Sequence, residues 1–266
     1  MTRFVRLALS AGAIALLSVV SAAAVTNGTP DGGGHPFVGW VFGETPEGWQ
    51  TVGCSGVLVA ENVVLTSGEC SYFLQAALAP NGNLQHVWVT FEPEDVAILG
   101  GVFDPPNTPP SVKVIRFATN PAYVENRGKG KDIANVGVLI LETPVAGPYA
   151  NLPVLNRLDA LAGDEAFTAA AYGTLKGQTV ATLMRRFAEA RFQGIGPNSV
   201  SLHMVDNGPD PACIGPQNEG GGAFLGTSEA VALIIEQEGY CARTDRFQRL
   251  DVENVRSFLS AFVPLP

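Results

Sequence analysis

Cys54 and Cys70 bound the stretch that decides the fold, CSGVLVAENVVLTSGEC. Its apolar residues are rich in valine, and they predict two short β-strands, at residues 52–59 and 63–66. Two cysteines this close to predicted strands can pair if the chain reaches an oxidising compartment. The stretch therefore predicts β structure, and the state of its cysteines depends on where the protein resides.

The amino terminus has the three parts of a secretory signal peptide. Two arginines precede an apolar segment at residues 7–20, and the small residues 22–24 offer a cleavage site. We therefore expect residues 1–24 to be removed, which leaves a mature chain of 242 residues that begins at Val25. No later segment is long and apolar enough to span a bilayer. The sequence thus predicts a secreted protein that is not held in a membrane after cleavage.

Four cysteines in an exported chain indicate two disulfides, because the count is even. The natural pairing is local, Cys54 with Cys70 and Cys213 with Cys241. A bond that closes a loop of about 16 residues contributes roughly 3 kcal/mol in the chain-entropy model. Zinc is the competing interpretation, but the spacings differ from those of zinc ligands and no histidine lies close to any cysteine. We therefore expect disulfides.

Short predicted strands follow one another along the mature chain, separated by glycine and proline turns. Besides those of the opening stretch, they are residues 38–42, 87–91, 96–99, 112–117, 133–141, 166–172, 230–235 and 247–252. Strands this short and regular predict an all-β sandwich or barrel. Residues 144–153, PVAGPYANLP, form the best linker between two halves of similar size. A short helix is predicted at residues 252–262, where apolar residues share one face.

The composition is that of a folded, acidic protein. Hydrophobic residues make up 46% of the chain, charged residues 15%, and the formal charge is −9. Signal removal changes this charge to −11, because the signal carries two arginines and no acid. An acidic surface repels phosphate groups, so the charge argues against nucleic acid as a partner.

Three segments resemble the trypsin-like serine proteases. The opening stretch is similar to the family segment that ends in LTAAHC, whose penultimate residue is the catalytic histidine; Glu69 stands at that position. The segment DIANVGVLILETPV resembles the one that begins with the catalytic aspartate, which Asp132 matches. The segment CIGPQNEGGGAFL, from Cys213, resembles the family's cysteine followed by GDSGGP. Aligning its glycine pair places Gly220 at the nucleophilic serine.

The resemblance covers the whole mature chain in the family's order. It implies an all-β fold of two packed antiparallel β-barrels with six strands each, a short C-terminal helix and an active-site cleft between the barrels. The N-terminal barrel is expected at about residues 25–147, the C-terminal barrel at about 152–251 and the helix at about 252–262.

The residues at the family's catalytic positions predict a protein without the family's activity. Gly220 has no hydroxyl with which to form an acyl-enzyme. Glu69 replaces the histidine that activates the serine hydroxyl in the family. Asp132 is the only triad residue that is retained. We therefore expect a pseudoprotease that acts by binding a peptide or protein ligand in the former active-site cleft. The alternatives are an endopeptidase with residual or relocated hydrolysis, and a protein kept for no specific interaction.

Two further pairings follow from the resemblance. In active members the new amino terminus pairs with the acid before the serine, so Val25 is expected to pair with Glu219, and residues 216–218 are an insertion in that loop. The family's histidine and aspartate touch, so Glu69 and Asp132 are expected to lie close together. Either a cation binds between these two carboxylates, or solvent surrounds them and their mutual repulsion raises the pKa of one of them. We favour the second outcome and expect no cofactor and no dedicated metal site.

None of the three histidines is expected to replace the lost base. His35, His86 and His203 are interpreted as ordinary surface or loop histidines. Pro211 stands where the family places its specificity-determining residue and Asp210 is one position away, so a preference for basic side chains is not inferred.

Overall fold

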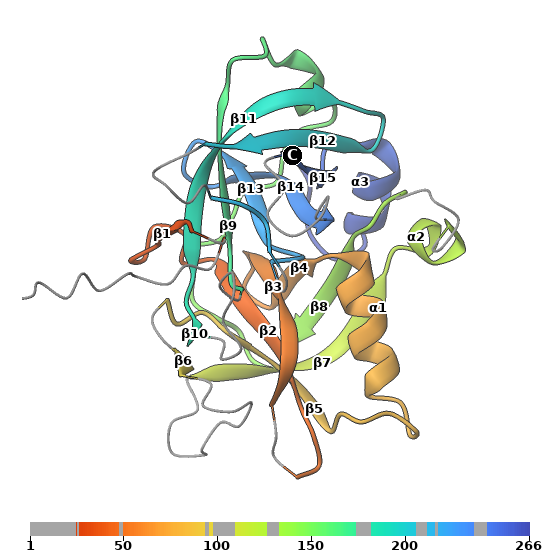
Figure 1. Cartoon of the computed structure of the whole chain (residues 1–266). Coiled ribbons are helices and arrows are strands. Elements are labelled where there is room, and N and C mark those ends of the chain that lie inside the picture. The colour runs from red at the N-terminus through yellow and green to blue at the C-terminus, as the bar shows by residue number, and fades with distance from the viewer. Residues whose placement is uncertain are drawn as a thin grey trace, which may run out of the picture.

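Two β-barrels, each closed by six antiparallel strands, make up most of the chain that the structure describes (Figure 1). This architecture confirms the predicted fold class. The computed structural model describes residues 25, 27–47, 50–93, 96–97, 110–126, 133–173, 182–205, 212–215, 218–236 and 244–266. The predicted signal segment, Asp132, Pro211 and Cys241 lie outside the described residues.

The first barrel is built from the first half of the chain. Its strands pair in the closed order β2-β3-β4-β8-β7-β5. The opening sequence stretch forms most of β3 and all of β4, which pair with Val57 opposite Leu65. The strands are β2 (Val38–Glu44), β3 (Gln50–Ala60), β4 (Val63–Thr66), β5 (His86–Thr90), β7 (Ser111–Thr119) and β8 (Gly137–Leu141).

The second barrel is built from the second half, in the order β11-β12-β15-β14-β13-β9, and a pairing of β9 with β11 closes it. Its strands are β9 (Ala166–Ala171), β11 (Arg186–Ile195), β12 (Ser199–Met204), β13 (Gly222–Leu225), β14 (Glu229–Glu236) and β15 (Thr244–Arg249). Strand β1 (Thr29–Pro30) pairs with β11, and β6 (Val96–Ala97) pairs with β10 (Thr182–Leu183).

Apolar side chains fill both barrels and the space between them. The cluster that fills the first barrel continues into the second through Tyr172 and Phe224, so the two barrels share an apolar interface. A separate cluster fills the second barrel, and the fully buried Val25 belongs to it. The predicted boundary assigns Val25 to the first barrel. In the structure Val25 and β1 pack on the second barrel instead, because β1 pairs with β11.

Helices lie at the edges of the barrels (Figure 1). The C-terminal helix α3 (Glu253–Leu259) confirms the predicted helix and ends before residue 262; Val255 and Leu259 are buried in it. Helix α1 (Gly68–Ala77) follows β4 directly and is not predicted from the sequence pattern. The other helical segments are α2 (Pro121–Asn126) and a 3-10 turn at Arg157–Ala160. Within the described residues, no helix has the length and hydropathy needed to cross a membrane.

Candidate functional site

Helix α1 carries Glu69 in its first turn, at the edge of the first barrel. Ser67 caps this helix, because its hydroxyl accepts a hydrogen bond from the backbone nitrogen of Cys70 at 3.0 Å. The predicted disulfide between Cys54 on β3 and Cys70 on α1 is present, with the two Cα atoms 6.4 Å apart. The nitrogen of Glu69 donates to Asn135 Oδ1 at 3.0 Å. Glu69 is thus fixed at a helix amino terminus, where the helix dipole favours a negative side chain.

The second barrel supplies Glu219, which lies in the loop before β13. Two backbone hydrogen bonds hold this loop in place. The nitrogen of Ser55 in the first barrel donates to Glu219 O at 2.8 Å, and the nitrogen of Gly220 donates to Ile234 O at 2.8 Å. Glu219 is therefore attached to both barrels at the point where they meet.

Asn218 anchors the same loop from inside the protein. This residue is fully buried. Its Oδ1 accepts a hydrogen bond from the nitrogen of Gly215 at 2.5 Å, and its Nδ2 donates to Tyr172 O at 2.8 Å. Because both the oxygen and the nitrogen of this buried side-chain amide are hydrogen-bonded, they hold the loop in place. The fold therefore sets the direction of the next side chain, that of Glu219.

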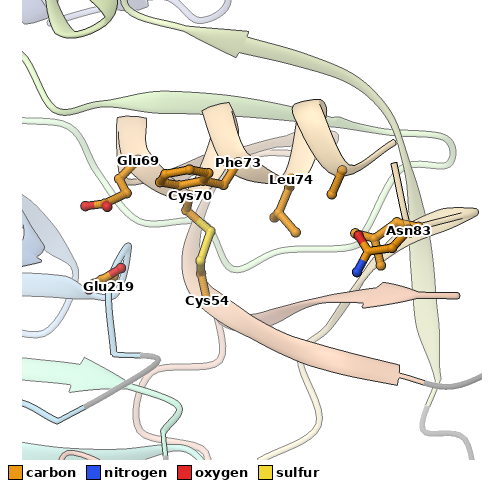
Figure 2. Close-up of a pocket in the computed structure, with 9 residues that line it drawn as sticks. Cys54, Glu69, Cys70, Phe73, Leu74, Asn83 and Glu219 are labelled. Carbon is orange, nitrogen blue, oxygen red and sulfur yellow. A yellow bond between two sulfur atoms is a disulfide. The ribbon is translucent and has the colours of Figure 1, made fainter. Parts of the chain in front are cut away.

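Glu69 and Glu219 line the same pocket, from opposite barrels (Figure 2). The pocket has a volume of about 340 Å³. The Cys54–Cys70 disulfide lies beside the two carboxylates, between helix α1 and strand β3. The side chains farther along are mostly apolar, Phe73, Leu74, Ala77 and Leu84, with Asn83 at the far end. The structure thus brings two acids together where the sequence predicts the histidine position and the loop of the nucleophile.

The two carboxylates influence each other electrostatically. Burial and, to a smaller extent, the nearby negative charge of Glu69 raise the pKa of Glu219 from its usual 4.5 to about 7. Near neutral pH, the carboxyl group of Glu219 is therefore partly protonated.

Gly220 has no room for a side chain. Its φ is +83°, a backbone conformation that residues with a β carbon rarely adopt. A β carbon there would fall well inside van der Waals contact with Ser55 O and Thr66 Oγ1. The prediction places the nucleophile's position at Gly220, yet the side chain that shares the pocket with Glu69 belongs to Glu219, one residue earlier.

Several predicted site features remain predictions. Asp132 and Cys241 lie outside the described residues, so neither the Glu69–Asp132 pair nor the Cys213–Cys241 bond can be described, although Cys213 is not a free cysteine. In the full-length chain the nitrogen of Val25 is part of a peptide bond, so its pairing with Glu219 also stays a prediction. Among the residues that the structure describes, no group of three or more His, Cys, Asp or Glu side chains is arranged to hold a metal ion.

His35 lies in a loop before β2, as predicted, but it is not at the surface, since only 8% of it is exposed. Its Nδ1 lies 2.5 Å from Asp31 Oδ1, and Arg185 Nε donates to Asp31 Oδ2 at 2.7 Å. Burial opposes ionisation of Asp31, but hydrogen bonds from His35 and Arg185 outweigh it and lower the pKa of Asp31 to about 2. The signal in the sequence is weak, because Asp31 and Arg185 are 154 residues apart.

The other two histidines lie in strands. His86 begins β5, and His203 in β12 is 3.2 Å from the hydroxyl of Thr244. Neither of them lines the pocket of Glu69 and Glu219.

No family model and no curated protein matches this sequence. Solved structures match its fold. Human heparin binding protein aligns with a TM-score of 0.62 and 15% identity, over 91% of this chain and 99% of that chain. A structure titled HL collagenase aligns with a TM-score of 0.59 and 14% identity, over 89% of this chain and 96% of that one. At these identities the likeness shows the fold, and the chain therefore has the two-barrel chymotrypsin fold of the trypsin-like serine proteases.

Proposed function

We propose that this protein is an exported, non-catalytic member of the trypsin-like group that binds an extended peptide segment in the cleft between its barrels. The observation that carries the proposal is the pair of glutamates in the pocket between the barrels. Glu69 stands at the position of the base, and Glu219 faces it from the loop in which active members carry the serine.

The chemistry of the pair supports the loss of peptidase activity. A carboxylate at either position cannot form the ester of an acyl-enzyme in the way that a histidine-activated serine does. In an analogous hydrolase, loss of the serine or the histidine alone lowers turnover roughly a millionfold. The conclusion holds for either register of the loop, because neither Glu219 nor Gly220 carries a hydroxyl.

We infer that Glu219, and not Gly220, occupies the nucleophile's place. It lies across the pocket from the residue at the histidine position, and the buried Asn218 precedes it as an acid precedes the serine in active members. The steric contacts around Gly220 support this one-residue shift, because a serine there would point into the wall of the first barrel.

The disulfides and the surface charge indicate the setting and the type of ligand. Disulfides persist in oxidising compartments, which is consistent with export. One solved structure of the same fold is named for binding heparin, a polyanion. The present chain carries a formal charge of −9, so a polyanion would be repelled and a neutral or basic peptide is the better ligand. The cleft of this fold can hold such a peptide as an added strand.

A serine-directed fluorophosphonate probe tests the proposal on the purified mature protein. We expect no labelling of the natural protein. The double variant Glu69→His with Glu219→Ser is expected to gain measurable labelling. Its matched control is Glu69→His with Gly220→Ser, which is expected to stay unlabelled because the serine has no room. Covalent labelling of a serine in the natural protein would overturn the proposal.

A second candidate function is hydrolysis by the carboxylate pair itself. The observation that favours it is the pKa of Glu219 near 7, since a protonated and an ionised carboxyl in one pocket can act as acid and base. Such activity would require both groups, so it would follow a bell-shaped pH profile and disappear in both Glu69→Gln and Glu219→Gln variants. A turnover with these properties would replace the binding proposal.

A further inference from the structure

The pocket of Glu69 and Glu219 follows one face of helix α1. The helix residues that line it are Glu69, Cys70, Phe73, Leu74 and Ala77, which share a face at helical spacing. With a rise of 1.5 Å per residue, the helix covers about 12 Å from Glu69 to Ala77. The pocket is therefore elongated, and we call it the α1 groove.

The two ends of the α1 groove differ in chemistry (Figure 2). The carboxylates of Glu69 and Glu219 lie at the amino end of the helix, and none of the described residues that line the groove carries a positive charge. Leu74, Ala77 and Leu84 line the other end. Phe73 lies between, and half of its surface is exposed. The groove thus joins a strongly anionic end to an apolar floor that solvent can reach.

We propose that the α1 groove binds a lysine side chain of an extended peptide, with the ammonium group between Glu69 and Glu219 and the alkyl stem along Phe73 and the disulfide. The proposal rests on the proposed function and names its ligand. A lysine side chain has the same two parts as the groove, an apolar stem and a charged end. A volume of about 340 Å³ lies at the low end of ligand pockets, which suits a side chain and its neighbours better than a large molecule.

Lysine fits the acidic end better than arginine does. An ammonium group has three donors that point in different directions, so it can bridge two carboxylates from different elements. A guanidinium group is planar and matches a single carboxylate through two parallel hydrogen bonds. Glu69 belongs to a helix of the first barrel and Glu219 to a loop of the second, so bridging is the geometry that the groove offers.

Binding of an ammonium group is coupled to the proton on Glu219. Its pKa of about 7 means that the empty groove is partly protonated at neutral pH. The charged group that faces Glu219 from among the described lining residues is Glu69; Asp132 lies outside the described residues. Because ammonium and proton compete for the same carboxylates, affinity is expected to fall about tenfold or more between pH 8 and pH 5.5.

Calorimetric titration of the mature protein with two peptides tests this proposal. One is a capped pentapeptide with lysine at its centre and glycine elsewhere; the other carries norleucine, which keeps the stem and lacks the ammonium group. At pH 8 we expect the norleucine peptide to bind at least tenfold more weakly. Glu69→Gln and Glu219→Gln should each weaken the lysine peptide about tenfold. Glu142→Gln, an exposed acid outside the groove, is the matched control and should leave its affinity unchanged.

Equal affinity of the natural protein for the two peptides, or undetectable binding of both, would overturn the lysine proposal. This comparison uses only the natural protein, so it does not depend on whether a variant folds. Unchanged affinity in the two glutamine variants would overturn it as well. These results leave the proposed function intact if the protein remains unlabelled by the fluorophosphonate probe and binds peptides of other sequence. Cleavage of either peptide would contradict the proposed function itself, so the two failures are distinguishable.

Discussion

At Gly220 the backbone turns with a φ of +83°, and the surrounding atoms leave no space for a β carbon. The turn continues through Gly221, whose nitrogen donates to Asn218 O at 2.9 Å. Between these fixed points the side chain of Glu219 lines the same pocket as Glu69. The glycine is therefore required by the loop, and the glutamate supplies the chemistry.

The variant Gly220→Ser is expected to destabilise the protein by about 3 kcal/mol or more, because it combines a positive φ with a close approach to Ser55 O and Thr66 Oγ1. Gly194→Ser is the matched control. Nothing lies within 4 Å of a β carbon at Gly194, so its effect should stay within about 1 kcal/mol. Urea unfolding of both variants measures the difference, and equal stabilities would contradict the steric account.

Glu219 is expected to make the stability of the protein pH-dependent in a particular direction. Its pKa of about 7 in the folded state exceeds the usual 4.5, so the folded protein binds more protons than the unfolded chain between these values. The free energy of unfolding should therefore fall by on the order of 2 kcal/mol as the pH rises from about 4.5 to about 7.

Thermal unfolding of the natural protein and of Glu219→Gln at pH 5 and pH 8 checks this expectation. The neutral amide should remove most of the pH dependence and should make the variant more stable than the natural protein at pH 8. A variant with the same pH dependence as the natural protein would show that Glu219 titrates normally.

The sequence predicts Glu69 at this site but not its partner across the pocket. Glu69 is recognised because a cysteine follows it directly in a specific motif. The loop of Glu219 contains three consecutive glycines, Gly220 to Gly222, so a Gly-Gly pair fits it in two registers. Only the space around Gly220 distinguishes them, and that space depends on Ser55 and Thr66, which are remote in sequence.

At the scale of elements, Asp31 joins strands that no local pattern connects. It follows β1, and its partner Arg185 directly precedes β11. The same guanidinium donates to Val38 O in β2 and to Phe91 O after β5, both at 3.0 Å. The ion pair is buried, so it ties the amino-terminal segment to both barrels.

Asp31→Asn is expected to destabilise the protein by roughly 3 to 5 kcal/mol, because it leaves the buried Arg185 without a compensating charge. Glu229→Gln is the matched control. It breaks the partly exposed pair with Arg157 and should cost at most about 1 kcal/mol. Chemical unfolding at neutral pH compares the two variants, and equal losses would contradict the role assigned to Asp31.

The lowered pKa of Asp31 predicts the pH range over which its contribution to stability is lost. Above its usual value of 3.8 the ionised form contributes its full stabilisation, which is lost as the pH falls toward about 2. The natural protein should therefore lose more stability over this range than Asp31→Asn does, as acid unfolding followed by circular dichroism would show.

Strands of the first barrel are easier to predict than those of the second. Strand β4 reads VVLT and is buried throughout, so β-branched residues reveal it. Strand β11 alternates buried and exposed positions near its start, but Ala188 and Ala190 supply part of its buried face. Alanine has a low preference for strands, so the sequence pattern misses β11.

Helix α1 is missed for a different reason. Its buried face is not a regular apolar repeat, because it is formed by Gly68, Cys70, Ser71 and Leu74.

The whole molecule joins the two-barrel fold to a pocket that two carboxylates line. The two barrels share an apolar interface, which holds Glu69 and Glu219 on opposite sides of one pocket. The pattern of strands predicts an all-β sandwich or barrel, and the resemblance of three segments to the trypsin-like serine proteases supplies the two-barrel arrangement. The chemistry of the site depends on how close Glu69 of the first barrel lies to Glu219 of the second. The packing of the two barrels sets this distance, which no local sequence pattern reveals.

Incubation of the purified mature protein with a diverse peptide library, read by mass spectrometry, tests the central claim most directly. The account predicts no cleavage product that depends on this protein, while peptides with lysine are retained on the immobilised protein at pH 8 and released at pH 5.5. Cleavage that persists through purification and disappears in Glu219→Gln would contradict the account, and would make the carboxylate pair the active site of a hydrolase.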